Sequence, residues 1–182
     1  MVVAFGSLFN TIEVRRTNSA GSVIETVKVP LAYGPKEKFL TRISADPNLN
    51  PGVALTVPRM GFELTSMTYD GVRKLNTMGR NVASGTTGLK KQYNPVPYNW
   101  DFTLYVYVKN AEDGTQILEQ ILPFFTPEFT VTMNLVSSMG EKRDIPLVLN
   151  SVTSEDTYEG DYASRRSIIW TLSFLMKGWF RS

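Results

Sequence analysis

The stretch Trp100–Lys109, WDFTLYVYVK, constrains the fold more strongly than any other part of the chain. Its residues alternate in chemistry with a period of two, which is typical of a β-strand. One face carries only apolar side chains: Phe102, Leu104, Val106 and Val108. The other face carries Tyr105 and Tyr107, and aromatic side chains there indicate a strand that is covered on both faces. We expect a helix or a neighbouring subunit to cover the second face.

Further ranges show strand-like patterns. They are Phe9–Arg16, Ser22–Val29, Val53–Thr68, Phe129–Val136, Ile145–Val152 and Arg166–Lys177. The first two are separated by TNSAG, which predicts a β-hairpin with a glycine-containing loop. Pro58 indicates an edge or a bulge in the third, because proline cannot donate a ladder hydrogen bond. The last three are joined by turn-rich segments, so we expect them to pair as antiparallel neighbours.

Two short helices are predicted between these strands. The first lies between Pro35, which suits an initial helical turn, and Pro47, which ends it. The second begins at Asp113, where Gln116 three residues later suggests a capping box, and ends before Pro123. Their apolar stripes are Phe39, Leu40 and Ile43 in the first helix and Ile117, Leu118, Ile121 and Leu122 in the second.

These elements predict an α+β fold. From Trp100 onward their order is β-α-β-β-β, and a single mixed or mainly antiparallel sheet flanked by two short helices accommodates it. A chain of 182 residues is long enough for one domain with a substantial core and short for two. We therefore expect residues 1–182 to form a single domain.

The chain contains no histidine and no cysteine. Disulfides, thiolate metal sites, cysteine nucleophiles and Ser-His-Asp triads are thereby excluded, so we expect no metal, no cofactor and no enzymatic activity of those kinds. Carboxylate chemistry stays open at Glu155, Asp156, Glu159 and Asp161. Their spacing does not match an EF-hand, and Gly160 among polar residues favours a solvated hairpin turn.

Residues 73–94, RKLNTMGRNVASGTTGLKKQYN, are basic and rich in glycine. Five cations occur without an acidic residue: Arg73, Lys74, Arg80, Lys90 and Lys91. The spacing does not match a phosphate-binding loop. Three readings stay open: an unstructured loop on the surface, a loop that orders in an assembly, and a nucleic-acid contact. We expect a long flexible basic loop, and a net charge of +2 confines any electrostatic function to such local patches.

The C-terminal stretch SIIWTLSFLMKGWF is the most apolar of the chain. Thr171, Ser173 and Lys177 interrupt it, and it falls short of roughly 18 apolar residues, so we expect no membrane span. Trp179 and Phe180 require a covering surface, because large aromatic side chains are otherwise exposed. Core packing explains each aromatic residue individually, but together with Tyr105 and Tyr107 they favour an oligomer.

Several segments together carry a resemblance to a known family. They are PKEKFL, PRMGFELT, YDGVRKLN, and PYNWDF at the start of the central strand. The resemblance as a whole extends from about Phe5 to Trp179. The chain resembles the tail sheath stabilizer and completion protein (tail terminator) family of T-even-like contractile-tailed phages. Longer members carry extra C-terminal sequence, so the resemblance does not imply a contact that such an extension would make, for example to the sheath.

The resemblance implies a structural virion protein at the tail–neck junction, made in the host cytoplasm. It implies a homohexameric ring with a fold of β-sheet flanked by helices and no catalytic residues. The implied partners are the tail tube protein, the last ring of sheath protein, the neck and head-completion proteins, and genomic DNA that passes without specific binding. The resemblance implies no membrane partner.

As subunit or partner contacts we nominate the five cations together with Tyr105, Tyr107, Trp179 and Phe180. The alternative is a nucleic-acid-binding module that acts through residues 73–91. A third hypothesis is a hydrolase that uses Glu155 and Asp156.

Overall fold

The computed structural model describes residues 1–182 except 20, 45–55, 86–87, 137–140, 158–166 and 181–182. Its helices are α1 (Val2–Leu8), α2 (Lys36–Ser44) and α3 (Ala111–Ile121), and α3 continues into the 3-10 turn η1 (Leu122–Phe124). Its strands are β1 (Glu13–Thr17), β2 (Val23–Lys28), β3 (Leu31–Tyr33), β4 (Arg59–Tyr69), β5 (Arg80–Gly85), β6 (Gly88–Tyr93), β7 (Val96–Val108), β8 (Glu128–Val136), β9 (Glu141–Thr157) and β10 (Ser167–Phe180).

The main sheet has six strands in the order β3-β4-β7-β10-β9-β8. Every neighbouring pair is antiparallel except β3 and β4, which run parallel. The predicted α+β class and the mainly antiparallel sheet are confirmed, as is the pairing of the last three strands. The described residues contain three helices rather than two, since α1 was not predicted.

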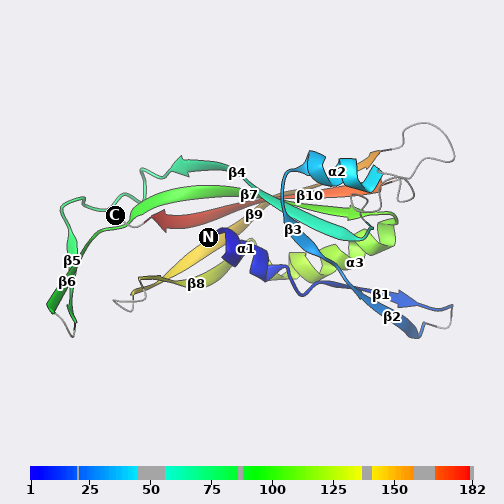
Figure 1. The fold of residues 1–182 in the computed structure, drawn as a ribbon, viewed down its shortest axis with the longest axis horizontal. Coiled ribbons are helices and arrows are strands. Elements are labelled where there is room, and N and C mark those ends of the chain that lie inside the picture. Colours follow the sequence, from blue (N-terminus) through cyan, green and yellow to red (C-terminus); the bar gives the residue numbers. More distant parts are fainter. Residues whose placement is uncertain (20, 45–55, 86–87, 137–140, 158–166, 181–182) are drawn as a thin grey trace.

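The central strands β7 and β10 are covered on both faces. On one face Phe102 is paired with Phe174, and Leu104 with Leu172, and all four side chains are buried. On the other face Tyr105 and Tyr107 form a smaller buried cluster, together with Phe39 of α2 and Ile169 of β10. Figure 1 shows α2 on one side of the sheet and α1 and α3 on the opposite side. The second face of β7, which we expected a helix or a neighbouring subunit to cover, is therefore covered by helix α2 of the same chain.

A glycine in β4 allows α2 to lie close to the sheet. A Cβ atom at Gly61 would lie 2.5 Å from the ring of Phe39, closer than any real contact. Phe39 itself is only 2% exposed, and its ring centroid lies 5.6 Å from that of Tyr107. The absence of a side chain in β4 thus creates the space in which α2 is anchored on the sheet.

Helix α1 places Phe5 at the centre of the core. Its ring stacks on Phe102 with a centroid separation of 4.4 Å and contacts Phe9, Phe62 and Phe174 at 5.1 to 5.4 Å. The strand predicted over Phe9–Arg16 begins only at Glu13, because Phe9 terminates α1 and turns into the core. A helix of seven residues is too short to show a helical period, which is why the sequence did not reveal it.

The expected capping box of α3 is wrong. The helix begins at Ala111 with Asn110 as its N-cap, and no side chain caps it. Asp113 instead accepts two hydrogen bonds from the Arg16 guanidinium, at 2.5 and 2.9 Å. The Gln116 side chain accepts a hydrogen bond from the Arg15 backbone N–H at 2.9 Å. Both predicted capping residues therefore attach the β1–β2 hairpin to α3.

Two other predicted boundaries shift in the structure, and one strand was not predicted. The strand expected over 53–68 begins at Arg59, just after Pro58, and residues 53–55 lie outside the described chain. The short strand β3 was not predicted. Strand β9 is longer than expected, so Glu155 and Asp156 lie in a strand opposite Ile169 and Ile168 rather than in a turn. The other two acidic residues of that cluster, at 159 and 161, lie outside the described residues.

We predict that Phe5→Ala destabilises the protein by about 3–5 kcal/mol, because truncation of a fully buried aromatic side chain leaves a cavity. Denaturant unfolding of the two proteins measures the difference. Val3→Ala in the same helix is the matched control, since Val3 is 85% exposed, and we expect it to change the free energy of unfolding by less than about 0.5 kcal/mol. Equal effects of the two substitutions would contradict this account of α1.

Candidate interaction surfaces

The basic stretch 73–94 contains a β-hairpin rather than only a loop. Strands β5 and β6 pair antiparallel, with Arg80 opposite Tyr93 and Val82 opposite Lys91. Figure 1 places this hairpin at one end of the elongated molecule, and the β1–β2 hairpin lies at the other end. We expected a long flexible basic loop here, and the structure instead shows two paired strands within this stretch.

Arg73 anchors the segment that leads into the hairpin. Its Nε donates to the Asp70 carboxylate at 2.6 Å, and its side chain is only 22% exposed. The rest of the guanidinium donates to the backbone oxygen of Lys177 (3.1 Å), the backbone oxygen of Tyr98 (3.3 Å) and Oδ1 of Asn99 (3.0 Å). Because the planar guanidinium is occupied by these acceptors, Arg73 acts as a structural clamp within the chain.

Trp179 takes part in the same clamp. The guanidinium carbons of Arg73 and Arg143 lie 5.1 and 4.8 Å from the centroid of its ring, within the range of cation–π attraction. Phe180 lies 5.0 Å from the rings of both Tyr98 and Trp100 and is 38% exposed. Each of these C-terminal aromatic residues thus packs against partners within the chain, and the side chain of Phe180 is also partly exposed to solvent.

Hydrogen bonding and burial shift three pKa values. The hydrogen bond from Arg73 lowers the pKa of Asp70. Burial raises the pKa of Tyr105, and its hydroxyl donates to Glu63 at 2.6 Å, which raises it further. Burial likewise raises the pKa of Tyr107. The two tyrosines are 8% and 0% exposed, so the structure places both of these nominated contact residues inside the chain.

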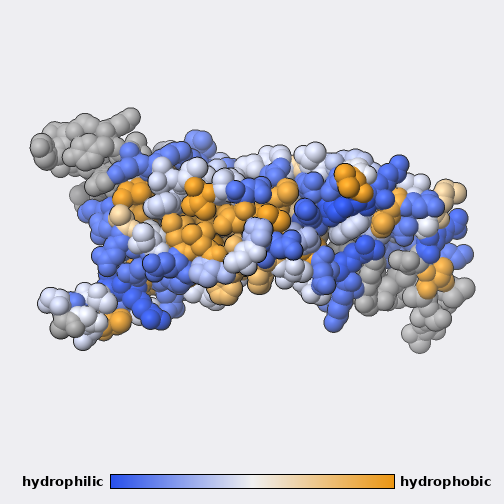
Figure 2. Space-filling model, turned by 180° about the vertical axis from the view of Figure 1, so that it is seen from behind, coloured by the Kyte–Doolittle hydropathy of each residue, from blue (hydrophilic) through white to orange (hydrophobic). Residues whose placement is uncertain are grey.

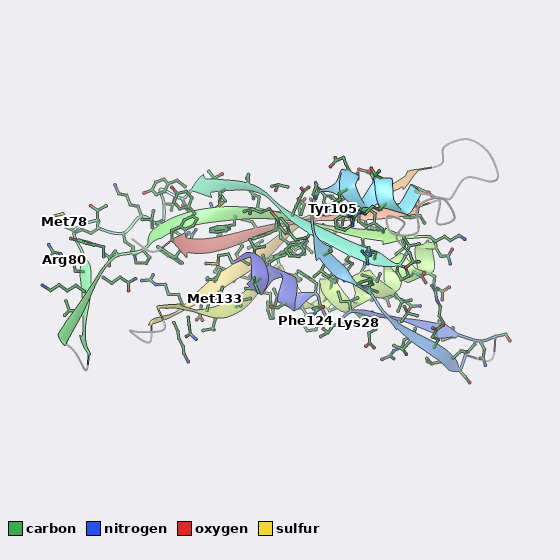
Figure 3. All side chains as sticks on the ribbon, viewed as in Figure 1. Lys28, Met78, Arg80, Tyr105, Phe124 and Met133 are labelled. Carbon is green, nitrogen blue, oxygen red and sulfur yellow. The ribbon has the colours of Figure 1, made fainter. Side chains whose placement is uncertain are left out.

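The remaining cations lie among exposed apolar residues. Lys74, Arg80 and Lys91 are exposed, and the side chain of Lys90 lies outside the described part of the chain. Around them Met78 is 75%, Val82 56% and Tyr93 49% exposed. Figure 3 shows Met78 and Arg80 together at this end of the molecule. We call residues 74–93 the basic arm.

An apolar groove lies between α1, α3, η1 and β8. It has a volume of about 390 Å³ and is lined by Leu8, Phe9, Thr11, Ile12, Gln120, Ile121, Phe124, Phe125 and Phe129. Phe124 is 63% exposed, and Leu122 beside it is 36% exposed. Figure 3 labels Phe124 near the middle of the molecule, and Figure 2 shows hydrophobic residues gathered over the middle of the molecule as seen from behind. We call this feature the Phe124 groove.

Neither a metal site nor a membrane helix is found in the described residues. No group of three or more His, Cys, Asp or Glu side chains among them is arranged to hold an ion. None of the described helices is sufficiently long and apolar to cross a membrane. Among the exposed features of this part of the chain are the basic arm and the Phe124 groove.

We predict that Arg73→Ala lowers the unfolding temperature by about 3–6 °C, because it removes the clamp and leaves Asp70 without its ion-pair partner. Thermal unfolding followed by circular dichroism measures this. Lys74→Ala is the control at the next position, where the side chain is exposed, and it should shift the temperature by no more than about 1 °C. If Lys74→Ala had the larger effect, the assignment of Arg73 as the clamp would fail.

The lowered pKa of Asp70 sets a pH dependence. A carboxyl whose folded pKa lies below its unfolded value of about 3.9 contributes stability above that value, and the contribution is lost as the pH falls through the folded pKa. The stability difference between wild type and Asp70→Asn should therefore be full at about pH 6 and shrink below about pH 4. Denaturant unfolding at a series of pH values tests this, and a constant difference down to about pH 2 would contradict it.

Comparison with known proteins identifies the family of the chain. Residues 1–181 match the model of the family described as T4-like virus Myoviridae tail sheath stabiliser. The chain is also similar to Tail completion protein gp15 of Enterobacteria phage T4, with 33% identity over 182 residues. That similarity covers 96% of this chain and 66% of the relative, so the chain spans slightly less than two thirds of its length. The match across nearly every residue shows that the chain belongs to the T4-like virus Myoviridae tail sheath stabiliser family.

Proposed function

We propose that this protein completes a contractile phage tail by forming a ring at its end. In this role the ring caps the tail tube, stabilises the last ring of sheath and offers a docking surface to the neck of the head. The family match over residues 1–181 carries the proposal, together with the tail-completion role that the name of the similar phage T4 protein states. The protein is thus a structural component of the virion, and we propose that residues 1–182 act as one domain.

The shape of the chain supports a ring. A closed cyclic assembly requires each subunit to offer two different surfaces, one to each neighbour. The elongated molecule carries its basic arm at one end, whereas the Phe124 groove lies near the middle (Figure 3). Two distinct exposed surfaces on one chain are what such heterologous contacts require, and a hexamer is the subunit number that the family resemblance implies.

The basic arm has little capacity to bind nucleic acid tightly. Arg73 is occupied inside the protein, and the arm presents three described cations, Lys74, Arg80 and Lys91, beside exposed apolar side chains. Affinity for a phosphate backbone increases with the number of phosphates that a protein neutralises. Three cations neutralise few phosphates, so we expect the arm to bind nucleic acid weakly at physiological salt. Genomic DNA is therefore proposed to pass through the ring without being held.

The carboxylate hydrolase has no support in the geometry. Glu155 forms an ion pair with Lys36 at 2.5 Å. Asp156 is the next residue of the same strand, and successive side chains of a strand point to opposite faces. The two carboxylates therefore do not converge on a common substrate position, and a structural role fits these residues better than a catalytic pair.

The proposal predicts that the purified protein binds to the ends of tails. Tails assembled without any completion protein should lose sheath or continue to grow, and addition of this protein should give tails of uniform length with an extra ring at the end. Negative-stain electron microscopy of the two preparations measures tail length and sheath retention. A matched sample with heat-denatured protein controls for non-specific effects. If tails with and without the protein had the same ends and lengths, the proposed function would be wrong.

A further inference from the structure

The main sheet has two margins along which another strand could be added. On one side β8 is the last strand and pairs with β9, and on the other side β3 covers β4 only from Met60 to Phe62. Among the described residues, no strand pairs with the outer side of β8 or with the outer side of β4 beyond Phe62. Figure 1 shows β4 and β8 on opposite margins, with β7, β10 and β9 between them. We call residues 66–69 the β4 edge and residues 129–134 the β8 edge.

The backbone of both edges directs hydrogen-bonding groups outward. The oxygen of Pro127 accepts a hydrogen bond from β9 at 3.1 Å, and inward and outward residues alternate along an antiparallel pair, so the N–H and C=O of Thr130 point away from β9. In the same way, the N–H of Asp70 donates to β7 at 3.2 Å, so the N–H and C=O of Tyr69 point away from β7. A row of such outward groups is a template for a further strand.

Neither edge carries the residues that usually protect an exposed strand. Natural proteins protect edge strands with charged side chains, with proline or by making the strand very short. The β4 edge reads SMTY and the β8 edge reads FTVTMN, without a charge or a proline in either. In contrast, β3 has only three residues and follows Pro30, and β1, β2, β5 and β6 all contain lysine, arginine or glutamate. The two margins of the main sheet are therefore the edges best suited to pair with another chain.

The two edges share the same facial pattern. Met67 lies opposite Trp100 and Tyr69 opposite Tyr98, and the side chains of Trp100 and Tyr98 belong to the main core. The apolar side chains of the β8 edge lie on the same face, where Met133 packs against that core. The opposite face is polar on both edges, with Ser66, Thr68, Thr130, Thr132 and Asn134. A sheet that continued from one edge to the other would therefore keep one apolar face and one polar face.

The apolar face of the β4 edge lacks a complete cover within one molecule. Met67 is 51% exposed and Tyr69 is 45% exposed, although both lie next to the buried side of β7. A strand added beside them would remove apolar surface from water and would also pair the outward backbone groups. The β8 edge offers both features, since it has outward amides and apolar side chains on the matching face.

The two edges of one molecule cannot pair with each other, because three strands separate them. We propose that the β8 edge of one copy pairs with the β4 edge of the next copy, so that the sheet continues from subunit to subunit. Four antiparallel steps lead from β4 to β8, so these two strands run in the same direction. Copies that repeat with the same orientation therefore join them as parallel neighbours.

This contact is heterologous, because each copy gives its β8 edge to one neighbour and its β4 edge to the other. Repetition of such a contact around an axis produces a closed ring, whereas pairing of two β8 edges would be isologous and stop at a dimer. The inference rests on the proposed ring and names the surfaces that join its subunits. Since the contact consists of backbone hydrogen bonds and apolar side chains rather than ion pairs, salt should weaken it little.

Cysteine cross-linking tests the contact, because the chain has no cysteine of its own. Thr130→Cys places one thiol on the β8 edge and Thr68→Cys places one on the β4 edge, both at exposed positions. A short bismaleimide should join the two variants only when they are mixed, and a size tag on one variant shows whether each dimer contains both. The double variant should give a ladder of covalent oligomers that ends at the subunit number of the ring, in solution and on tails.

Proline substitution tests the same contact without a cross-linker. The N–H of Thr130 points away from β9, so Thr130→Pro removes no hydrogen bond of the β8–β9 ladder but obstructs a strand on the outer side. Self-association, measured by sedimentation velocity, should weaken by at least about tenfold. The circular dichroism spectrum should stay that of the folded protein, and the unfolding temperature should stay within about 4 °C of wild type.

The matched control is the same substitution on another edge strand. Thr26 of β2 lies opposite Arg15, whose N–H is bound by Gln116 of α3 and therefore points away from β2. The N–H of Thr26 likewise points away from β1, so Thr26→Pro also removes only an outward donor. We expect Thr26→Pro to associate like wild type. Equal loss of association in both proline variants would show a general effect of proline and would contradict the proposed contact.

The outcomes separate this inference from the proposed function. If wild type forms rings and completes tails but the mixed cysteine variants do not cross-link and Thr130→Pro assembles normally, the edge contact is wrong and the proposed function stands. If Thr130→Cys alone cross-links to itself, the β8 edges pair with each other and the inference is overturned. If Thr130→Pro loses tail binding but keeps self-association, the edge serves a different tail protein and the inference is again overturned. If wild type neither self-associates nor binds tails at any concentration, both are wrong.

Discussion

The pairing of β7 with β10 is the interaction on which the rest of the structure depends. It runs without interruption from Ile168 opposite Val108 to Phe180 opposite Val96. Because both faces of this pair carry large apolar side chains, neither strand is stable until the two faces are covered. Phe5 of α1 covers one face through its stack on Phe102, and Phe39 of α2 covers the other. The sheet, the helices and the N-terminal segment are thus joined in one network of contacts.

The two hairpins at the ends of the molecule are held by different means. The β1–β2 hairpin is fixed to α3 by the ion pair between Arg16 and the buried carboxylate of Asp113. The β5–β6 hairpin depends on Arg73, which joins the end of β4 to β7 and β10 through hydrogen bonds and the face of Trp179. Polar clamps of this kind orient a projecting element and leave its own surface exposed, as an assembly protein requires.

Particular residues show how much of the structure could be predicted from the sequence. The period-two patterns located the main strands, because burial of one face fixes the alternation. The tyrosines of β7 correctly indicated a second cover, but the choice between helix and neighbour required the position of α2. Asp113 and Gln116 matched a capping box by spacing and were assigned the wrong partners, since Arg16 and Arg15 approach them from about a hundred residues away.

The sequence by itself determined the strand pattern, the absence of histidine and cysteine chemistry, the family and the basic stretch 73–94, because each of these is a property of residue type and local spacing. Only the tertiary structure decided which of those residues are free to bind. Arg73 and Lys74 are neighbours of equal charge, yet the first is held by acceptors from β7, from β10 and from Asp70 just after β4, whereas the second is exposed. That difference arises from long-range packing, which brings Asp70, Asn99 and Lys177 around one guanidinium and leaves the next side chain in solvent.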